Sequence, residues 1–238
     1  TFAVYFAIVL LLHSLPFSWR VKKVNLLVAS YLFYAAWNPP FIILLWISTV
    51  VDWWAANRIA QASNPWRRRA WMLTSVCLNL GMLGWFKYGE FLLANFQALA
   101  ATVGIDYQPP AFDIVLPVGI SFYTFATMSY TLDVYLRRAE PTPRMLDFAL
   151  FVTFFPPLVA PPLMRPTELV PQFEQPRRAS MDQLRFGLAL MTLGLFQKVV
   201  LADGFLAAPA EQVYDNTMAP GALDAWFGTL AFSGQIFC

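Results

Sequence analysis

The sequence predicts an all-α protein, a polytopic bundle of transmembrane helices, and two observations support this prediction. Hydrophobic residues make up 58% of the 238-residue chain, and charged residues make up only 13%. Soluble domains carry roughly 25% charged residues, so this chain has too little charge to hydrate the surface of a soluble globule. Apolar stretches that approach the roughly 20 residues of a spanning helix also recur along the chain. The composition therefore excludes a soluble enzyme, a nucleic-acid-binding protein and a disordered chain.

The candidate spans follow one another with short polar breaks. They are residues 2–17, 24–37, 41–56, 70–86, 114–132, 148–164, 186–201 and 225 onward. Asn38, Pro39 and Pro40 separate the second span from the third, because two prolines break a helix and predict a tight turn. Residues 87–103 carry apolar side chains at helical spacing, which predicts an amphipathic helix on the outer membrane surface; the alternative is a loop.

The basic residues predict the orientation of these spans. Lys and Arg gather in alternate connections, at residues 16–23, 57–69 and 133–147. Residues 38–40 and 202–224 hold neither, and residues 87–113 hold only Lys87. Because connections rich in Lys and Arg stay on the cytoplasmic side, this alternation predicts a multi-pass protein with the basic connections inside.

The alternation fails at residues 148–164, which we expect to enter and leave the membrane on the cytoplasmic side. Four arginines follow this stretch, and a crossing would place all of them outside. They are Arg165, Arg177, Arg178 and Arg185. Two proline pairs, at residues 156–157 and 161–162, also interrupt the stretch, and unwound backbone is tolerated at membrane depth only where protein or water satisfies it. The sequence therefore predicts a proline-rich re-entrant segment.

We expect residues 1–238 to form a single transmembrane domain, because the chain shows no internal repeat and no linker. Apolar runs open and close the sequence, which indicates a fragment of a longer protein. Cys77 and Cys238 are too few and too far apart for a metal site or a disulfide framework. The lone histidine, His13, is interpreted as structural.

Hydroxyl side chains form a stripe on the fifth span. At about 100° per residue, Ser121, Thr124, Thr127 and Thr131 fall within an arc of about 120°, and Tyr123 flanks it. Such a stripe could line an aqueous or acyl-group channel. Alternatively, the hydroxyls bond back to their own helix, or the stripe packs on another helix.

Several charged residues are candidates for a functional role, each with a simpler alternative. Arg165 follows the re-entrant segment directly, and a guanidinium near membrane depth needs an anionic partner, so it is a candidate contact for a phosphate-bearing donor. The alternative is an Arg that reaches the lipid headgroups. Asp133 ends the fifth span and is a candidate for the donor passage. Alternatively, it caps the helix or pairs with Arg137. Lys198 and Asp203 are expected to pair or to flank the outer interface, and Asp52 is expected to be an ordinary interface carboxylate.

Several sequence blocks, in register, resemble the membrane-bound O-acyltransferase family, and more narrowly its bacterial members that acetylate alginate. The most specific are LPVGISFY at residues 116–123 and SYTLDVY at residues 129–135. The others are residues 25–34, 85–88, 147–149, 154–162 and 197–203. The resemblance covers nearly the whole chain.

The resemblance implies a membrane O-acyltransferase (acetyltransferase) of the bacterial inner membrane. Such an enzyme would move an acetyl group from a cytoplasmic donor, acetyl-CoA or another acyl carrier, toward an exported polysaccharide such as alginate. Membrane lipid and periplasmic polysaccharide-acetylation proteins are the implied partners, with no nucleic acid, no metal and no bound cofactor. The donor-passage candidates in this chain are Ser121, Tyr123, Thr124, Thr127, Thr131, Asp133 and Arg165.

Two departures from the family pattern affect the prediction. The family's histidine follows a DFxGYSDMAIG-like motif that lies beyond Cys238, so we expect this chain to hold no catalytic residue and to be inactive alone. Pro161 stands where the family has Gly, which would alter the re-entrant segment, since Pro lacks the conformational freedom of Gly. The alternative function is half of a polytopic transporter or channel, because a re-entrant segment and a polar stripe suit that class equally.

Overall fold

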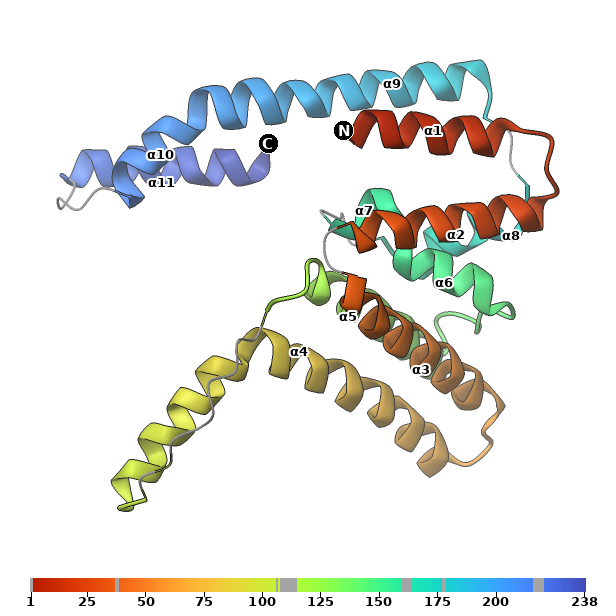
Figure 1. Ribbon diagram of the computed structural model, residues 1–238, viewed down its shortest axis with the longest axis horizontal. Coiled ribbons are helices and arrows are strands. Elements are labelled where there is room, and N and C mark those ends of the chain that lie inside the picture. Colours follow the sequence, from red (N-terminus) through yellow and green to blue (C-terminus); the bar gives the residue numbers. More distant parts are fainter. Residues whose placement is uncertain are drawn as a thin grey trace. The chain divides into compact units, whose positions relative to one another are not determined.

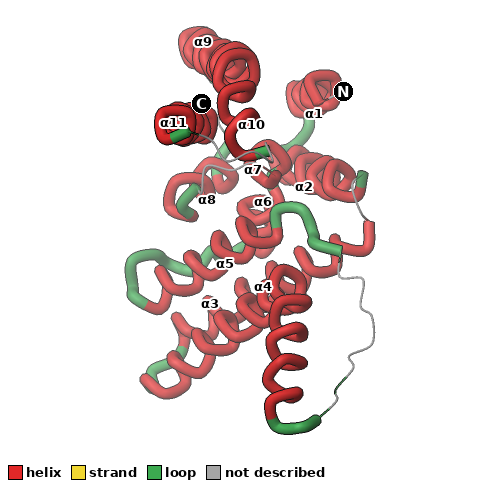
Figure 2. Tube along the Cα trace, turned by 90° about the vertical axis from the view of Figure 1, so that its left-hand side faces the viewer, coloured by secondary structure: helices red, strands yellow, loops and turns green. Residues whose placement is uncertain are grey.

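The computed structural model describes residues 2–36, 39–105, 107, 115–159, 164–176, 179–215 and 221–238. Helices joined by turns make up these ranges, and Figure 2 shows no strand among them. The all-α prediction is therefore confirmed. Two helical stretches, Pro39–Gln61 and Met181–Tyr214, are long and apolar enough to cross a membrane. The chain divides into two compact units, Thr1–Pro176 and Arg177–Cys238, and each is described by itself.

The first unit is built around three helices that pack on one another, α3, α4 and α5 (Figure 1). Its elements are α1 (Phe2–Ser14), α2 (Trp19–Ala35), η1 (Pro39–Phe41), α3 (Ile42–Gln61), α4 (Pro65–Thr102), α5 (Ile120–Tyr135), α6 (Met145–Thr153), α7 (Phe155–Val159) and α8 (Pro166–Glu174). Helix α6 packs against α2, α3 and α8, and α1 packs against α2. The apolar core joins α5 to α6 through Tyr130 and Phe148, whose ring centroids are 4.4 Å apart.

Helix α4 differs from the prediction of a span followed by a separate surface helix. It runs without interruption from Pro65 to Thr102, because no proline follows Pro65 within it. Asn64 caps its start by accepting a hydrogen bond from the Trp66 N–H at 2.8 Å. Figure 1 shows α4 as two arms that meet at a bend. The helical prediction for residues 87–103 is confirmed as far as Thr102, and the position of this arm on the membrane surface stays a prediction.

Special backbone conformations mark both ends of α5. Gly119 precedes the helix with φ of +74°, a left-handed conformation that suits glycine. Arg137 follows the helix with φ of +60°, and the N–H of Arg138 donates to the Asp133 carbonyl at 2.8 Å. These are the features of a Schellman C-cap with an arginine where glycine is usual.

The proline-rich segment is broken into short helices. Helix α6 has nine residues, which at 1.5 Å per residue span about 13 Å, well short of a hydrocarbon core of about 30 Å. Helix α7 follows directly, and residues 160–163, including Pro161, lie outside the described residues.

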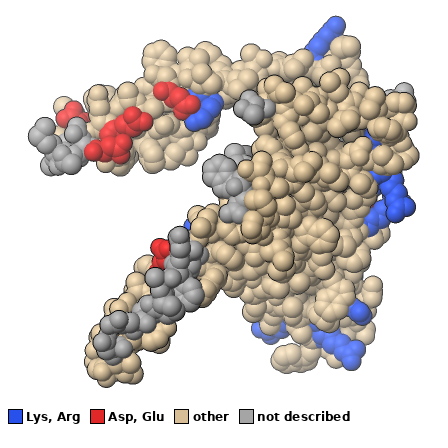
Figure 3. Space-filling view, in the orientation of Figure 1, with Lys and Arg blue, Asp and Glu red and all other residues tan. Residues whose placement is uncertain are grey.

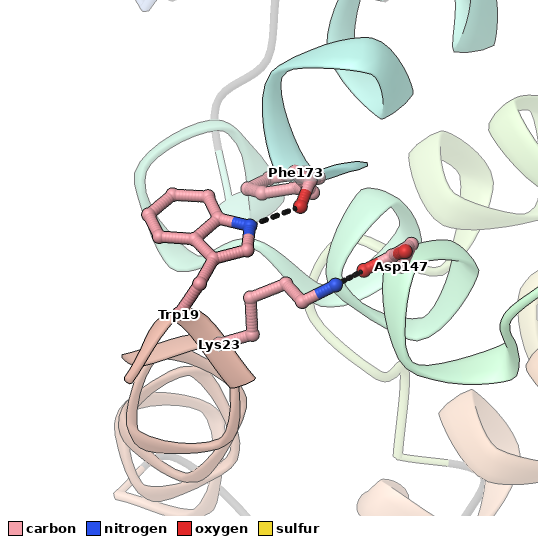
Figure 4. A network of polar contacts seen from close by, with 4 residues as sticks. All are labelled: Trp19, Lys23, Asp147 and Phe173. Atoms are coloured by element: carbon pink, nitrogen blue, oxygen red, sulfur yellow. Dashed lines mark hydrogen bonds and ion pairs between the residues drawn. The ribbon is translucent and has the colours of Figure 1, made fainter. Parts of the chain in front are cut away.

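The first turn of α6 and the last turn of α8 both contact the start of α2 (Figure 4). Lys23 forms a buried ion pair with Asp147 of α6, and the indole N–H of Trp19 donates to the Phe173 carbonyl of α8 at 2.7 Å. Trp19 and Lys23 are one helical turn apart. The chain from α6 to the end of α8 therefore starts and ends beside the same turn of α2, and the re-entrant path of residues 148–164 stays a prediction.

The second unit consists of α9 (Met181–Phe196), the π-helix η2 (Gln197–Leu206), α10 (Ala207–Tyr214) and α11 (Ala222–Phe237). The prediction of a loop over residues 202–224 is wrong as far as Tyr214, because alanine-rich sequence continues the helix. Pro209 cannot donate to the carbonyl one turn earlier, and the wider π-helix precedes it. Lys198 and Asp203 pair at 2.8 Å, as predicted.

Candidate functional site

The hydroxyl stripe of α5 faces α3 and α4. Thr124, Thr127 and Thr131 are completely buried, Tyr123 is 2% exposed and Ser121 is half-buried. The hydroxyl of Thr131 donates to the Thr127 carbonyl at 3.3 Å, and that of Thr127 is 3.1 Å from the Thr124 carbonyl. This is the geometry of the packing alternative, and a role of the stripe in acyl passage stays a prediction.

The stripe meets a buried polar cluster that we call the Asp52 cluster. It consists of Ser48 and Asp52 on α3, Ser75 and Asn79 on α4, and Thr127 on α5. The Asn79 Nδ2 donates to Asp52 Oδ2 at 2.7 Å, and the Ser48 hydroxyl donates to Asn79 Oδ1 at 2.7 Å. All five residues are 0% exposed. The cluster ties the three central helices together through side-chain hydrogen bonds.

Asp52 corrects the prediction of an interface carboxylate. Helix α3 extends to Gln61, nine residues beyond Asp52, so the carboxyl lies within the helix and inside the bundle. The sequence held a signal for this cluster, because Ser48 and Asp52 are four residues apart and so are Ser75 and Asn79. Residues at this spacing share one face of a helix, and two such polar faces in apolar helices predict that the faces meet.

Arg165 lies beside a different face of α5. Two adjoining hollows run along this face, and together they form what we call the α5 groove. The wider hollow, of about 480 Å³, is lined by Phe125, Ala126, Met128, Ser129, Leu132, Met164 and Arg165. The narrower one, of about 40 Å³, shares Ala126 and Met164 with it and is also lined by Tyr123. Of the predicted site residues, the structure therefore brings Tyr123 and Arg165 to one groove.

The polar groups of the α5 groove are few and distinct. Arg165 is exposed and makes no ion pair among the described residues. The Tyr123 hydroxyl is buried beside the Tyr34 hydroxyl of α2, and the Ser129 hydroxyl donates to the Ala126 carbonyl of its own helix. The groove thus combines an exposed cation at its wide end with an apolar lining and a buried tyrosine side chain at its narrow end. A slender acyl-bearing chain with a terminal phosphate has the complementary chemistry.

Asp133 lies off the hydroxyl stripe and belongs to neither the groove nor the Asp52 cluster. It is half-buried near the end of α5, and its backbone carbonyl accepts the C-capping hydrogen bond of Arg138. It forms no ion pair with Arg137 within the described part of the chain. In the same part of the chain, no group of three or more His, Cys, Asp or Glu side chains could hold a metal ion.

The Lys23–Asp147 ion pair is a feature that the sequence did not predict. The charge pattern places Lys23 in a cytoplasmic connection, but α2 begins at Trp19 and the lysine is only 2% exposed. Its ammonium group contacts Asp147, which is 1% exposed (Figure 4). A lysine stem can follow an apolar surface to a partner at depth, so a basic residue at a predicted span end is not always a free topology signal.

Sequence comparisons identify relatives of the chain. Over 92% of its length, the chain is 37% identical to a probable alginate O-acetylase AlgI of Pseudomonas aeruginosa, of which it covers 41%. It is 36% identical to the corresponding protein of Azotobacter vinelandii, over 92% of its length and 43% of that protein. The chain is homologous to the AlgI-like O-acetylases. This similarity confirms the resemblance inferred from the sequence blocks.

A third relative carries out a different acetylation according to its name. Over 90% of its length, the chain is 30% identical to the peptidoglycan O-acetyltransferase of Helicobacter pylori, of which it covers 45%. No family model matches the chain. The chain spans less than half the length of each of these three relatives. The names of the relatives refer to different polymers, alginate and peptidoglycan.

Proposed function

We propose that the chain is part of a membrane O-acetyltransferase that acetylates a polysaccharide outside the cytoplasmic membrane. The observation that carries this proposal is the similarity over 92% of the chain to proteins named alginate O-acetylases. The related peptidoglycan O-acetyltransferase supports the class of reaction and widens the range of polymers. In the net reaction, the acetyl C–S bond of a thioester breaks, a C–O bond to a sugar hydroxyl forms, and the hydroxyl proton ends on the released thiol.

The proposed orientation follows from the basic connections. In Figure 1, the turns before α2, between α3 and α4, and between α5 and α6 share the right-hand side of the first unit. Figure 3 shows Lys and Arg side chains gathered along the same margin. The positive-inside rule assigns such a margin to the cytoplasm. This supports a multi-pass protein of the bacterial inner membrane, with the first turns of α2 and α6 on the side where an acyl thioester is made.

The α5 groove is the proposed contact site for the acyl donor. Arg165 would bind the phosphate of an acyl carrier such as acetyl-CoA, because its guanidinium is exposed and unpaired among the described residues. The Tyr123 side chain at the narrow end would contact the acyl group. The hydroxyl stripe would hold α5 in place from the opposite face through the Asp52 cluster. Membrane lipid surrounds this unit in the proposal, and periplasmic acetylation proteins receive or guide the polymer.

The experiment is to express the full-length protein in a cell that lacks its own gene for this step and to measure ester-linked acetate on the extracellular polysaccharides. Acetylation that depends on the gene supports the proposal, and unchanged acetate with intact protein in the membrane contradicts it. Analysis of the purified polymers then distinguishes alginate from peptidoglycan.

Arg165→Gln tests the donor contact. Loss of a charge-assisted hydrogen bond costs about 1.5–3 kcal/mol, so we expect the donor KM to rise about 10- to 100-fold with little change in protein level. Arg69→Gln is the matched control, because Arg69 is an exposed arginine away from the groove. Equal effects of both substitutions would remove Arg165 from the proposal while leaving the acetyltransferase assignment intact.

A further inference from the structure

Two buried aspartates in the described chain have opposite surroundings. Asp147 is 1% exposed and Asp52 is 0% exposed, so neither carboxyl is hydrated by bulk water. Asp147 contacts the Lys23 ammonium group, which supplies a compensating positive charge. Asp52 forms no ion pair with any Lys or Arg of the described residues. The two side chains are chemically identical, so any difference in their charge must come from these surroundings.

Amide and hydroxyl groups surround the Asp52 carboxyl. Asn79 Oδ1 accepts from Ser48 at 2.7 Å and from Thr127 at 3.3 Å, which turns the Nδ2 of Asn79 toward Asp52 Oδ2 at 2.7 Å. Within the described chain, Asp52 Oδ1 has no hydrogen-bond partner, and the buried Ser75 hydroxyl, which faces the carboxyl, has none either. One neutral N–H donor therefore contacts this carboxyl directly.

The charged groups on the packed helices point elsewhere. Arg58 of α3 is exposed and lies over the Trp54 ring, and Arg68 of α4 donates to the Tyr135 carbonyl at 2.8 Å. Tyr130 of α5 is close enough to interact with the carboxyl, and its hydroxyl accepts from the Thr142 N–H at 2.8 Å. None of these groups brings positive charge to Asp52.

We propose that Asp52 is a proton-binding site inside the helical bundle, held as the neutral carboxylic acid, with its proton on Oδ1. A carboxylate removed from water without a counter-charge is so costly that such a group takes up a proton instead. The proton on Oδ1 leaves Oδ2 as the acceptor for Asn79, in agreement with the hydrogen bond present. It also removes the uncompensated charge from Oδ1, the carboxyl oxygen that accepts no hydrogen bond among the described residues.

The proposal gives Asp52 a positioning role that differs from that of Asp147. The neutral acid joins α3 to Asn79 of α4, and Asn79 joins both helices to Thr127 of α5. Helix α5 is thereby fixed from its polar face. Ionisation of Asp52 would place an uncompensated charge at the contact of these three helices, so proton loss and loosening of the bundle are coupled.

The test compares Asp52→Asn with Asp147→Asn in the full-length protein, purified in detergent. An amide reproduces the hydrogen bonds of a neutral acid, so Asp52→Asn should keep a monodisperse protein with an unfolding temperature close to the original. Asp147→Asn leaves the Lys23 ammonium group buried without its counter-charge, so it should lower the unfolding temperature strongly or abolish folding. Equal losses in the two variants would overturn the proposal.

Infrared spectroscopy tests the proton itself without depending on acetyl transfer or on either variant's stability. Protein labelled with ¹³C in the aspartate carboxyls should show an isotope-shifted protonated-carboxyl band at neutral pH. Asp52→Asn should lose this band, and its absence from the unsubstituted protein would overturn the proposal. A last measurement compares the unfolding temperature in sodium chloride and in choline chloride at equal ionic strength. If sodium raises the unfolding temperature and Asp52→Asn abolishes this increase, the cluster binds a metal cation and the proposal is overturned.

Discussion

Gly119 should be among the glycines of the first unit that are least tolerant of substitution. It precedes α5 with φ of +74°, and a Cβ at this position would lie 2.7 Å from the Leu158 carbonyl oxygen of α7. Real Cβ atoms essentially never approach another atom this closely, and backbone on the facing side cannot rotate away as a flexible side chain can. Gly119→Ala therefore imposes both a conformational cost and a steric cost.

The magnitude follows from these two contributions. A left-handed conformation costs an alanine about 1–2 kcal/mol relative to glycine. Overpacking a close contact costs about 1–3 kcal/mol more, as the neighbouring backbone shifts. We therefore expect Gly119→Ala to lower the free energy of unfolding by about 2–5 kcal/mol, with displacement of α7 from the start of α5.

Two other glycines separate these contributions. Gly104 has φ of +80° and open space for 4 Å around the position that a Cβ would take, so Gly104→Ala should cost only the conformational term of about 1–2 kcal/mol. Gly84 lies within α4 with open space around it, so Gly84→Ala should stabilise by up to about 0.5–1 kcal/mol. Unfolding of the three variants of the full-length protein, followed by tryptophan fluorescence in detergent, measures the order. A Gly119→Ala cost equal to that of Gly104→Ala would refute the steric argument.

Three further predictions concern the ion pair, the orientation and the end of α5. Lys23→Met should destabilise by about 3–5 kcal/mol, because it leaves Asp147 buried and unpaired, and adding Asp147→Leu should recover most of this loss in a denaturation experiment. In a cysteine-free protein, a reagent excluded from the cytoplasm should label a cysteine at Asp215 and spare one at Arg68. Arg137→Gly should stabilise the protein by about 1 kcal/mol in thermal unfolding, because glycine adopts the left-handed conformation after α5 at a lower conformational cost than arginine.

Hydropathy predicted where most helices lie, because each apolar stretch must form internal hydrogen bonds whatever its neighbours are. The spans at residues 2–17, 24–37 and 41–56 all correspond to helices, with ends that differ by several residues. Helix ends were less predictable, because charged residues also occur within helices. Lys23 illustrates this point, since Asp147, which is distant in sequence, makes its position inside α2 possible.

The candidate site was predicted less completely, because it depends on which faces of the helices meet. The spacing of Thr124, Thr127 and Thr131 defined one polar face of α5 correctly, but it could not say whether that face bordered a channel or another helix. The structure places it against Asn79, and the groove that holds Arg165 follows the other face.

The buried polar residues explain why such a face was ambiguous. In an apolar helix, a serine, threonine or asparagine has the same spacing whether it lines a passage or binds a neighbouring helix, and only the partner's polar face separates the two cases. Here the partner is present in the sequence, since Ser48 and Asp52 on α3 and Ser75 and Asn79 on α4 each repeat at four residues. Three polar faces that must all avoid lipid can satisfy one another by meeting, and the hydrogen bonds among them fix the rotation of α5. That rotation turns the opposite face, with Arg165 beside it, toward the groove that we propose for the acyl donor.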